Sequence, residues 1–246
     1  MEENALWRLY HTLLAYYGPQ HWWPAETPFE VIIGAILTQS TAWRNVEQAI
    51  QNLKRVGALS PAELAARPES ELAALIRPAG YFNAKARKIK AFVHHLMTVH
   101  GGRLESLFDQ DVPSLRRELL GLHGIGPETA DCIILYAAGQ PSFVIDAYTR
   151  RILERLGLIS NARADYTALQ ALFTSHLPRD TALYQEYHAL LVRHGKELCR
   201  RIPRCGNCPL AATCALGRAQ HAIPPPADLP HPTPPLTPPR RQSPVR

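Results

Sequence analysis

The sequence predicts an all-α protein with a cysteine-rich loop near its C-terminal end. Apolar residues recur at helical spacing from about residue 5 to about residue 195, and signals for strands are scarce. Short turns such as RPAGYFN and HGIGP separate the helical segments. The 246 residues suffice for one large domain or two modest ones, and the turn-rich stretches 18–27 and 138–146 mark candidate crossings between two helical lobes.

The first segment, MEENALWRLYHTLLAYYG, begins with acidic residues and has helical spacing, so it does not resemble a signal peptide. No apolar run reaches the roughly 18 residues that a membrane helix needs. We therefore expect a cytoplasmic protein with no membrane association. The chain has 27 Lys and Arg against 21 Asp and Glu, a moderate positive balance that favours nucleic acid as a partner without identifying it.

The next segment, QHWWPAETPFEVIIGAILTQSTAW, contains Trp22, Trp23 and Trp43. Adjacent tryptophans before a proline are more often core residues than pocket residues, and both interpretations stay open from the residues alone. Further along, Lys85 and its basic neighbours follow the GYFN turn and are typical of a solvated helix face.

The stretch LRRELLGLHGIGPETAD predicts a helix, a tight glycine turn and a second helix that begins near Pro127. Gly124 and Gly126 allow positive φ and bring no side chain, so their N–H groups can approach a phosphate closely. An ordinary corner between helices is the alternative. Glu128 is most simply a first-turn acid favoured by the helix dipole. Asp146, which precedes another helix, reads by itself as an N-cap.

Four cysteines crowd into sixteen residues, in the pattern C-x5-C-x2-C-x5-C formed by Cys199, Cys205, Cys208 and Cys214. Four thiolates at this spacing indicate a metal site, and zinc and a [4Fe–4S] cluster both accept such a ligand set. Beyond this loop, residues 224–246 hold ten of the 22 prolines, so we expect a disordered tail over residues 218–246.

Together, the run LHGIGPETADCIILYAAGQPSFVIDAYTRRILERLG resembles the helix-hairpin-helix and aspartate signature of the endonuclease III superfamily of base-excision DNA glycosylases. FEVIIGAILTQST and RPAGYFNAKARKIK resemble further motifs of that family, and the cysteines lie where its iron–sulfur cluster lies. The resemblance implies a lobe of residues 23–133, a second lobe of residues 1–22 and 134–217, and double-stranded DNA with a damaged base between them. It also implies a [4Fe–4S] cluster and a monomer.

The resemblance also implies roles for individual residues. Asp146 is the expected catalytic carboxylate, which stabilises the sugar cation and helps to activate the nucleophile. The base flips into a pocket, Gln39 fills the gap, Tyr81 or Phe82 wedges the opposite strand, and the hairpin grips the backbone. The expected DNA-binding residues are Gln39, Tyr81, Phe82, Lys85, Gly124 and Gly126.

Bifunctional members of the family carry a lysine at the position of Glu128, and that amine forms a Schiff base with the sugar. Glutamate cannot form an imine, so we expect a monofunctional enzyme. The arrangement of WWP, the LTQ motif and Trp43 is similar to the 3-methyladenine glycosylase branch, in which the damaged base stacks on aromatic residues. This similarity makes Trp22, Trp23 and Trp43 the expected base pocket, with alkylated purines as candidate substrates.

Three alternatives stay open. The chain is one residue shorter than the family pattern in its first cysteine gap, which leaves zinc as an alternative to the cluster. An oxidised-pyrimidine glycosylase with lyase activity would need a lysine from elsewhere in the chain. A non-catalytic DNA-lesion binder would have no need for a carboxylate at Asp146.

Overall fold

The computed structural model describes residues 4–222, which form helices and loops and contain no strand. The α-helices are α1 (Ala5–Tyr17), α2 (Pro28–Leu37), α3 (Trp43–Arg55), α4 (Pro61–Ala66), α5 (Glu69–Leu75), α6 (Phe82–His100), α7 (Leu104–Phe108), α8 (Val112–Leu120), α9 (Pro127–Cys132), α10 (Ala147–Leu156), α11 (Tyr166–Thr174), α12 (Thr181–Glu197) and α13 (Ala215–Ala222). The shorter helical turns are η1 (Arg77–Ala79), the π-helical turn η2 (Ile133–Ala137) and η3 (Cys205–Asn207). The predicted all-α class is confirmed.

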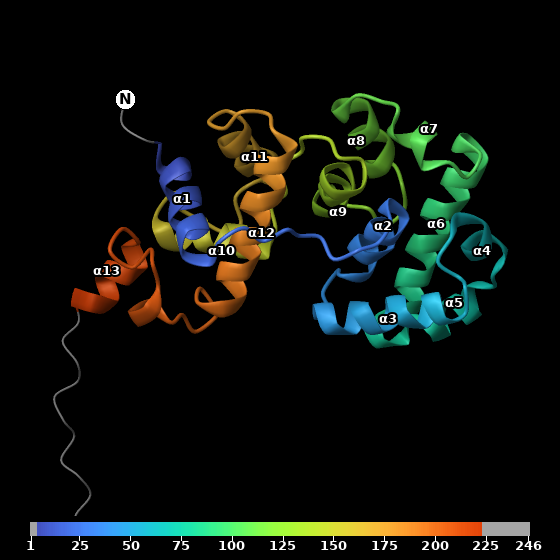
Figure 1. The fold of residues 1–246 in the computed structure, drawn as a ribbon, viewed down its shortest axis with the longest axis horizontal. Coiled ribbons are helices and arrows are strands. Elements are labelled where there is room, and N and C mark those ends of the chain that lie inside the picture. The colour runs from blue at the N-terminus through green and yellow to red at the C-terminus, as the bar shows by residue number, and fades with distance from the viewer. Residues whose placement is uncertain (1–3, 223–246) are drawn as a thin grey trace, which may run out of the picture.

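The helices fall into two groups (Figure 1). Helices α2 to α9 form one group, and α1 with α10 to α13 forms the other. The chain passes between the groups along residues 18–27 and again along residues 138–146, and η2 packs against both α2 and α12. The lobe limits expected at residues 22 and 133 stay predictions.

Helix α2 is buried within its group, as expected for the sequence PFEVIIGAIL, which is apolar on all faces apart from Glu30. All its residues from Phe29 to Leu37 are buried. Thr27 caps the helix through a hydrogen bond from the Glu30 N–H to its hydroxyl, 3.1 Å long. The buried Glu30 carboxylate is paired with Lys54 at 2.9 Å, which meets the requirement that a buried charge has a partner.

Helix α13 occupies residues that the sequence assigned to the tail. It runs to Ala222, so the predicted tail boundary at residue 218 falls inside a helix. The reason is its sequence ALGRAQHA, in which alanine and leucine favour a helix. This helix packs against α10. Residues 223–246, and with them the prolines of the predicted tail, lie outside the described residues.

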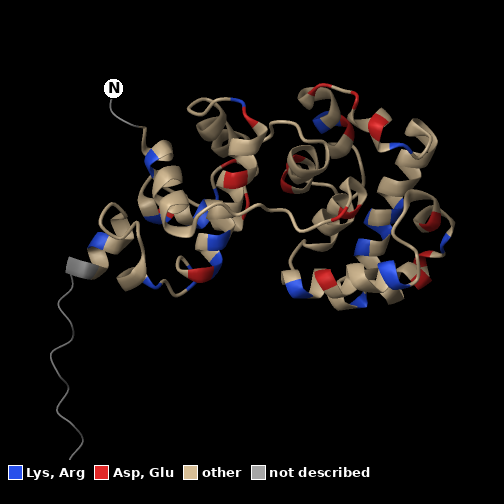
Figure 2. Cartoon of the chain, in the orientation of Figure 1, with Lys and Arg blue, Asp and Glu red and all other residues tan. Residues whose placement is uncertain are grey.

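Basic residues are spread over both groups of helices, with acidic residues among them (Figure 2). The distribution of charged residues therefore does not by itself mark a DNA-binding or catalytic surface. Within residues 4–222, no helix is both long enough and apolar enough to cross a membrane.

Candidate active site

A cavity of about 480 Å³ brings together residues from five separate segments of the chain. This volume lies within the range of small-molecule sites. Its lining includes the expected catalytic aspartate, the expected aromatic residues and two groups for which no catalytic role was expected. These residues are Trp22, Trp23, Trp43, Glu128, Asp146 and His188.

Asp146 caps α10 and also faces this cavity. Its Oδ1 atom accepts hydrogen bonds from the Thr149 N–H at 2.7 Å and the Thr149 hydroxyl at 2.9 Å. Burial by itself would raise the pKa of Asp146, but His188 and the Thr149 hydrogen bonds outweigh it, and the pKa lies below its usual value. The carboxylate is therefore held ionised although it is buried, with Oδ2 left to face the cavity.

His188, on α12, lies close to that oxygen. Its Nε2 atom lies 3.8 Å from Asp146 Oδ2, too far for a direct hydrogen bond, and has no hydrogen-bond partner among the described residues. Its Nδ1 atom lies 2.8 Å from the Tyr136 hydroxyl, which also lies 3.2 Å from the Gln185 carbonyl. Because a carbonyl only accepts, Tyr136 donates to Gln185 and accepts from Nδ1–H. Nε2 is thus free to meet a third group in the cavity.

Glu128 also lines the cavity, from the first turn of α9. Glu128 is an exposed residue, yet protein atoms surround its carboxyl group on most sides. Burial and, to a smaller extent, the negative charge of Asp146 together raise the pKa of Glu128 to about 7. Two carboxyl groups with separated pKa values, one ionised and one titrating near neutrality, therefore share the site.

The three tryptophans form a connected aromatic wall. The Trp22 and Trp23 rings lie 5.0 Å apart, and Trp23 meets Trp43 edge-on at 5.3 Å. Trp22 also contacts Tyr136 at 5.6 Å. Trp23 and Trp43 pack against the hydrophobic core as well as lining the cavity.

The glycine turn before α9 differs in detail from expectation. Gly124 has φ of 80°, in the left-handed region, and a Cβ there would lie 2.3 Å from a Lys88 side-chain carbon. Gly126 has φ of −93° and ψ of 178°, an extended conformation open to any residue, so the expected positive φ is absent there. A Cβ on Gly126 would meet no atom within 4 Å, which leaves open space beside the N-terminus of α9.

Comparison with known proteins gives this geometry a family. Residues 33–178, more than half of the chain, match the model described as HhH-GPD superfamily base excision DNA repair protein. The chain belongs to the HhH-GPD superfamily. The resemblance that the sequence motifs gave is thereby confirmed.

Relatives of this HhH-GPD protein agree with that placement. A protein of Methanocaldococcus jannaschii that bears the name of a DNA repair glycosylase is 46% identical over 87% of this chain and 99% of its own length. Endonuclease III of Thermotoga maritima is 31% identical over 78% of this chain and 84% of its own. The HhH-GPD chain is accordingly a DNA glycosylase of base excision repair, and the non-catalytic alternative falls away.

Two solved structures resemble the HhH-GPD fold seen here. The H. pylori 3-methyladenine DNA glycosylase, bound to 1,N6-ethenoadenine, has a TM-score of 0.66 at 26% identity and covers 77% of this chain and 96% of its own. An endonuclease III in a non-covalent DNA complex has a TM-score of 0.76 at 22% identity, covering 88% and 96% of the two chains. At that lower identity the likeness concerns the fold.

Lys85 of this HhH-GPD protein does not lie where a phosphate contact requires. Only 2% of its surface is exposed, and its ammonium group donates hydrogen bonds of 2.8 Å to the Leu37 and Ala79 carbonyls. Burial lowers the pKa of Lys85 to about 8, with the neighbouring charge of Lys88 adding to the effect. Lys85 thus ties α2 to η1, and the expectation that it binds DNA is wrong because its side chain points into the lobe.

The GYFN turn has the exposure expected of a wedge. Tyr81 is 75% exposed and adopts φ of 45°, a left-handed conformation that is costly for a residue with a Cβ. Phe82, which begins α6, is half-buried with the Arg77 guanidinium 5.9 Å from its ring centroid. Of the two candidates, Tyr81 is the one that projects from the HhH-GPD fold.

Gln39 is bound to the hairpin in this structure. Its amide nitrogen donates to the Gly124 carbonyl at 3.2 Å and to the Thr129 hydroxyl at 2.9 Å, and its oxygen accepts from Lys88. Gln39 therefore lies beside the HhH-GPD cavity, between α2 and the glycine turn.

The cysteine loop brings four free thiols to the lining of one apolar cavity. Arg155 of α10 fixes the loop: it donates to Cys199 Sγ at 3.4 Å, and Cys214 Sγ donates to its carbonyl at 3.0 Å. Burial raises the pKa of Cys205, and the nearby Cys214 and Cys199 raise it further. A bound cation would relieve this repulsion between thiolates, so the donor set fits a metal centre.

Sequence reasoning missed His188 and Tyr136 in this HhH-GPD site. Each lies in an apolar helical stretch, where a histidine or tyrosine is usually a core residue. Their 52-residue separation leaves no local pattern that points to their contact.

Proposed function

We propose that this glycosylase is monofunctional and removes damaged bases, with alkylated purines as the leading class, from double-stranded DNA by hydrolysis of the N-glycosidic bond. The observation that carries the proposal is that Glu128 lines the same cavity as Asp146. Glu128 stands at the position of the lysine in bifunctional members, and a carboxyl group there has no amine with which to form an imine.

The aromatic wall supports the choice of substrate. A flipped base entering the cavity meets Trp22 and Trp43, both of which line it. An alkylated purine carries a positive charge, so an electron-rich aromatic surface holds it well and its glycosidic bond is already weak. The similar H. pylori enzyme holds 1,N6-ethenoadenine, another modified purine.

Asp146 and His188 are suited to hold the attacking water. A gap of 3.8 Å between two polar atoms fits a bridging water rather than a direct bond. In the proposed reaction the bond between sugar C1′ and the base breaks, its electrons leave with the base, and the water oxygen bonds to C1′. The carboxylate of Asp146 stabilises the sugar cation and receives the water proton, while His188 positions the water and the carboxylate.

The monomer grips DNA between lobes of residues 23–133 and of residues 1–22 with 134–217. In this proposal Gly124 and Gly126 approach the backbone and Gln39 exchanges its hydrogen bonds with the hairpin for the gap left by the base. Tyr81 wedges the opposite strand, and the neighbouring Phe82 supports it. The exposure of Tyr81 and the open space at Gly126 support these assignments.

The four thiols of the cysteine loop, Cys199, Cys205, Cys208 and Cys214, would hold a [4Fe–4S] cluster. Such a cluster stabilises the loop that follows α12. Arg151 connects this loop to the cavity, since it lines the cavity and donates to the Cys199 carbonyl at 2.8 Å. The proposed role of the cluster is therefore structural support for α10 and α12.

One observation favours the alternative of a lyase. Lys196 is exposed and lines the cavity from the end of α12, so it is the candidate for an amine supplied from outside the hairpin. The two proposals differ in whether a covalent complex with DNA forms.

Duplexes that each contain a single defined lesion provide the test, incubated with the protein with and without hot alkali and with borohydride. A monofunctional enzyme gives broken strands only after alkali and no trapped complex. Efficient trapping by the wild-type protein would overturn the proposal, and its loss in Lys196→Gln would then identify the amine.

A further inference from the structure

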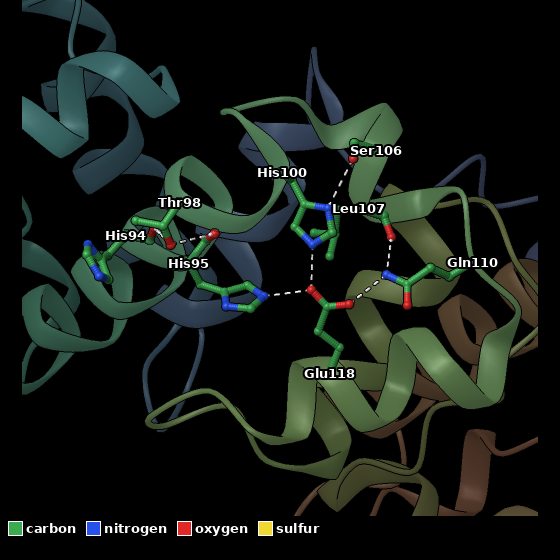
Figure 3. A network of polar contacts seen from close by, with 8 residues as sticks. All are labelled: His94, His95, Thr98, His100, Ser106, Leu107, Gln110 and Glu118. Carbon is green, nitrogen blue, oxygen red and sulfur yellow. Dashed lines mark hydrogen bonds and ion pairs between the residues drawn. The ribbon is translucent and has the colours of Figure 1, made fainter.

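Three potential metal ligands converge at the end of α6, on the side of the lobe formed by α6, α7 and α8 (Figure 3). The Glu118 Oε1 atom lies 2.6 Å from His95 Nε2 and 2.5 Å from His100 Nε2. One ligand atom from each of the three residues lies within 4.8 Å of the others. None of the three lines the base cavity.

We propose that His95, His100 and Glu118 form a binding site for one divalent transition-metal ion, with zinc as the ion to be used as a probe. Two imidazole nitrogens and one carboxylate oxygen are a ligand set that zinc and similar ions prefer. With three protein ligands, solvent water completes the coordination.

The surrounding hydrogen bonds orient the ligand atoms as a metal site requires. The Gln110 amide donates to Glu118 Oε2 at 2.6 Å, which leaves Oε1 facing the two histidines. The Ser106 hydroxyl lies 3.2 Å from His100 Nδ1, on the far side of the ring from Glu118. Hydrogen bonds to the ring nitrogen that does not bind the metal fix the orientation of metal-binding histidines.

The Ser106 hydroxyl also lets His100 change tautomer without losing a partner. Without metal, His100 Nε2–H donates to Glu118 and Nδ1 accepts from Ser106. With metal, Nε2 offers its lone pair and Nδ1–H donates to the same hydroxyl. Ser106 therefore remains hydrogen-bonded to His100 Nδ1 both without and with metal.

The geometry requires a small expansion to admit an ion. Zinc–nitrogen bonds of about 2.0 Å place tetrahedral ligand atoms roughly 3.3 Å apart, so the contacts of 2.6 and 2.5 Å must widen by less than about 1 Å. The His95 and Glu118 side chains are 23% and 20% exposed, which gives an ion a path from solvent. Bound metal would join α6 to α8, the helix that leads into the hairpin.

The test is calorimetric titration of the full-length protein, with its cysteine-bound metal in place, with zinc chloride. We expect one zinc per chain at this site. His95→Gln and Glu118→Gln should each weaken binding by roughly tenfold or more, since loss of a ligand costs at least as much as loss of a hydrogen bond that orients a ligand. His94→Gln is the matched control, because His94 directly precedes His95 on α6 and points away from Glu118 (Figure 3).

The iron content before and after titration separates this site from the cysteine loop and must stay unchanged. Zinc-edge anomalous diffraction from a zinc-soaked wild-type crystal needs no variant, and should give a peak between the three side chains. Absence of zinc binding, equal binding by wild type and His95→Gln, or an anomalous peak only elsewhere would show that the cluster is a hydrogen-bond network alone.

Discussion

His188 Nε2 lies 3.8 Å from Asp146 Oδ2, and both side chains are almost completely buried. The helices that carry them, α10 and α12, pack against each other, so the distance is fixed by the fold. A buried carboxylate and a buried imidazole at this separation can both hydrogen-bond to one water that lies beside the pair. This relationship underlies the first two predictions.

Asp146→Asn should lower the rate of base excision by ~10²-fold or more, because it removes a preorganised charge from the position of the sugar cation. The amide retains an oxygen that can accept from Thr149, so the cap of α10 should survive. DNA affinity should stay the same or rise as repulsion from phosphate is relieved. Single-turnover excision and binding measurements check this, and a fully active variant would refute the catalytic assignment.

His188→Leu should slow excision by ~10-fold or more and move the acidic limb of the pH–rate profile to higher pH. The sign follows from the pKa of Asp146: burial raises it, and His188 is the largest influence that lowers it. Without His188 the carboxylate becomes protonated at a higher pH, so activity is lost sooner as the pH falls.

Tyr136→Phe is the control for the effect of His188, since it removes the hydroxyl that orients Nδ1 but leaves the imidazole in place. It should shift the profile less than His188→Leu. An unmoved acidic limb in His188→Leu would reduce His188 to a packing role.

Glu128→Lys should allow borohydride to trap a covalent complex with DNA. The reason is that residue 128 lines the cavity with Asp146, so an amine at this position lies where it can attack the sugar. Glu128→Gln, which has no nucleophile, serves as the control and should trap nothing. A folded Glu128→Lys protein that excises bases without trapping would place this position too far from the sugar.

Trp43→Ala should weaken excision of a cationic base such as 3-methyladenine by ~1–3 kcal/mol of transition-state binding, the usual value of stacking between a base and an aromatic ring. Binding to an abasic-site analogue should be spared, because that ligand has no base to stack. Trp7→Ala, in α1 and outside the cavity, controls for general loss of stability. Normal excision by Trp43→Ala would assign Trp43 to the core alone.

Purified protein should be yellow-brown and contain about four iron and four sulfide per chain. Cys199→Ser should lower the melting temperature and the iron content more than it changes the excision rate of the protein that stays folded, because the loop supports the site without entering it. Colourless protein with zinc bound to the cysteines would mean that the shortened first gap selects zinc.

The local features of the fold were predictable from the sequence. Pro127 begins α9 as expected, because its ring presets φ and its missing N–H would have had no partner in the first turn. Asp146 caps α10, because its side chain reaches an N–H only three residues away. Helix starts and caps depend on residues only a few positions apart, so they can be predicted from neighbouring residues.

The sequence by itself thus determined the helical class, the hairpin and the family, since periodicity and motifs are properties of contiguous residues. Only the tertiary structure decided that Lys85 is buried with its ammonium group bonded to the Leu37 carbonyl, 48 residues away. It alone also placed His188 beside Asp146. It also decided that Glu128 shares the cavity of Asp146 and acquires a pKa of about 7. Burial and charge pairing depend on which distant segments pack together, and that packing is set by the whole core rather than by any local pattern.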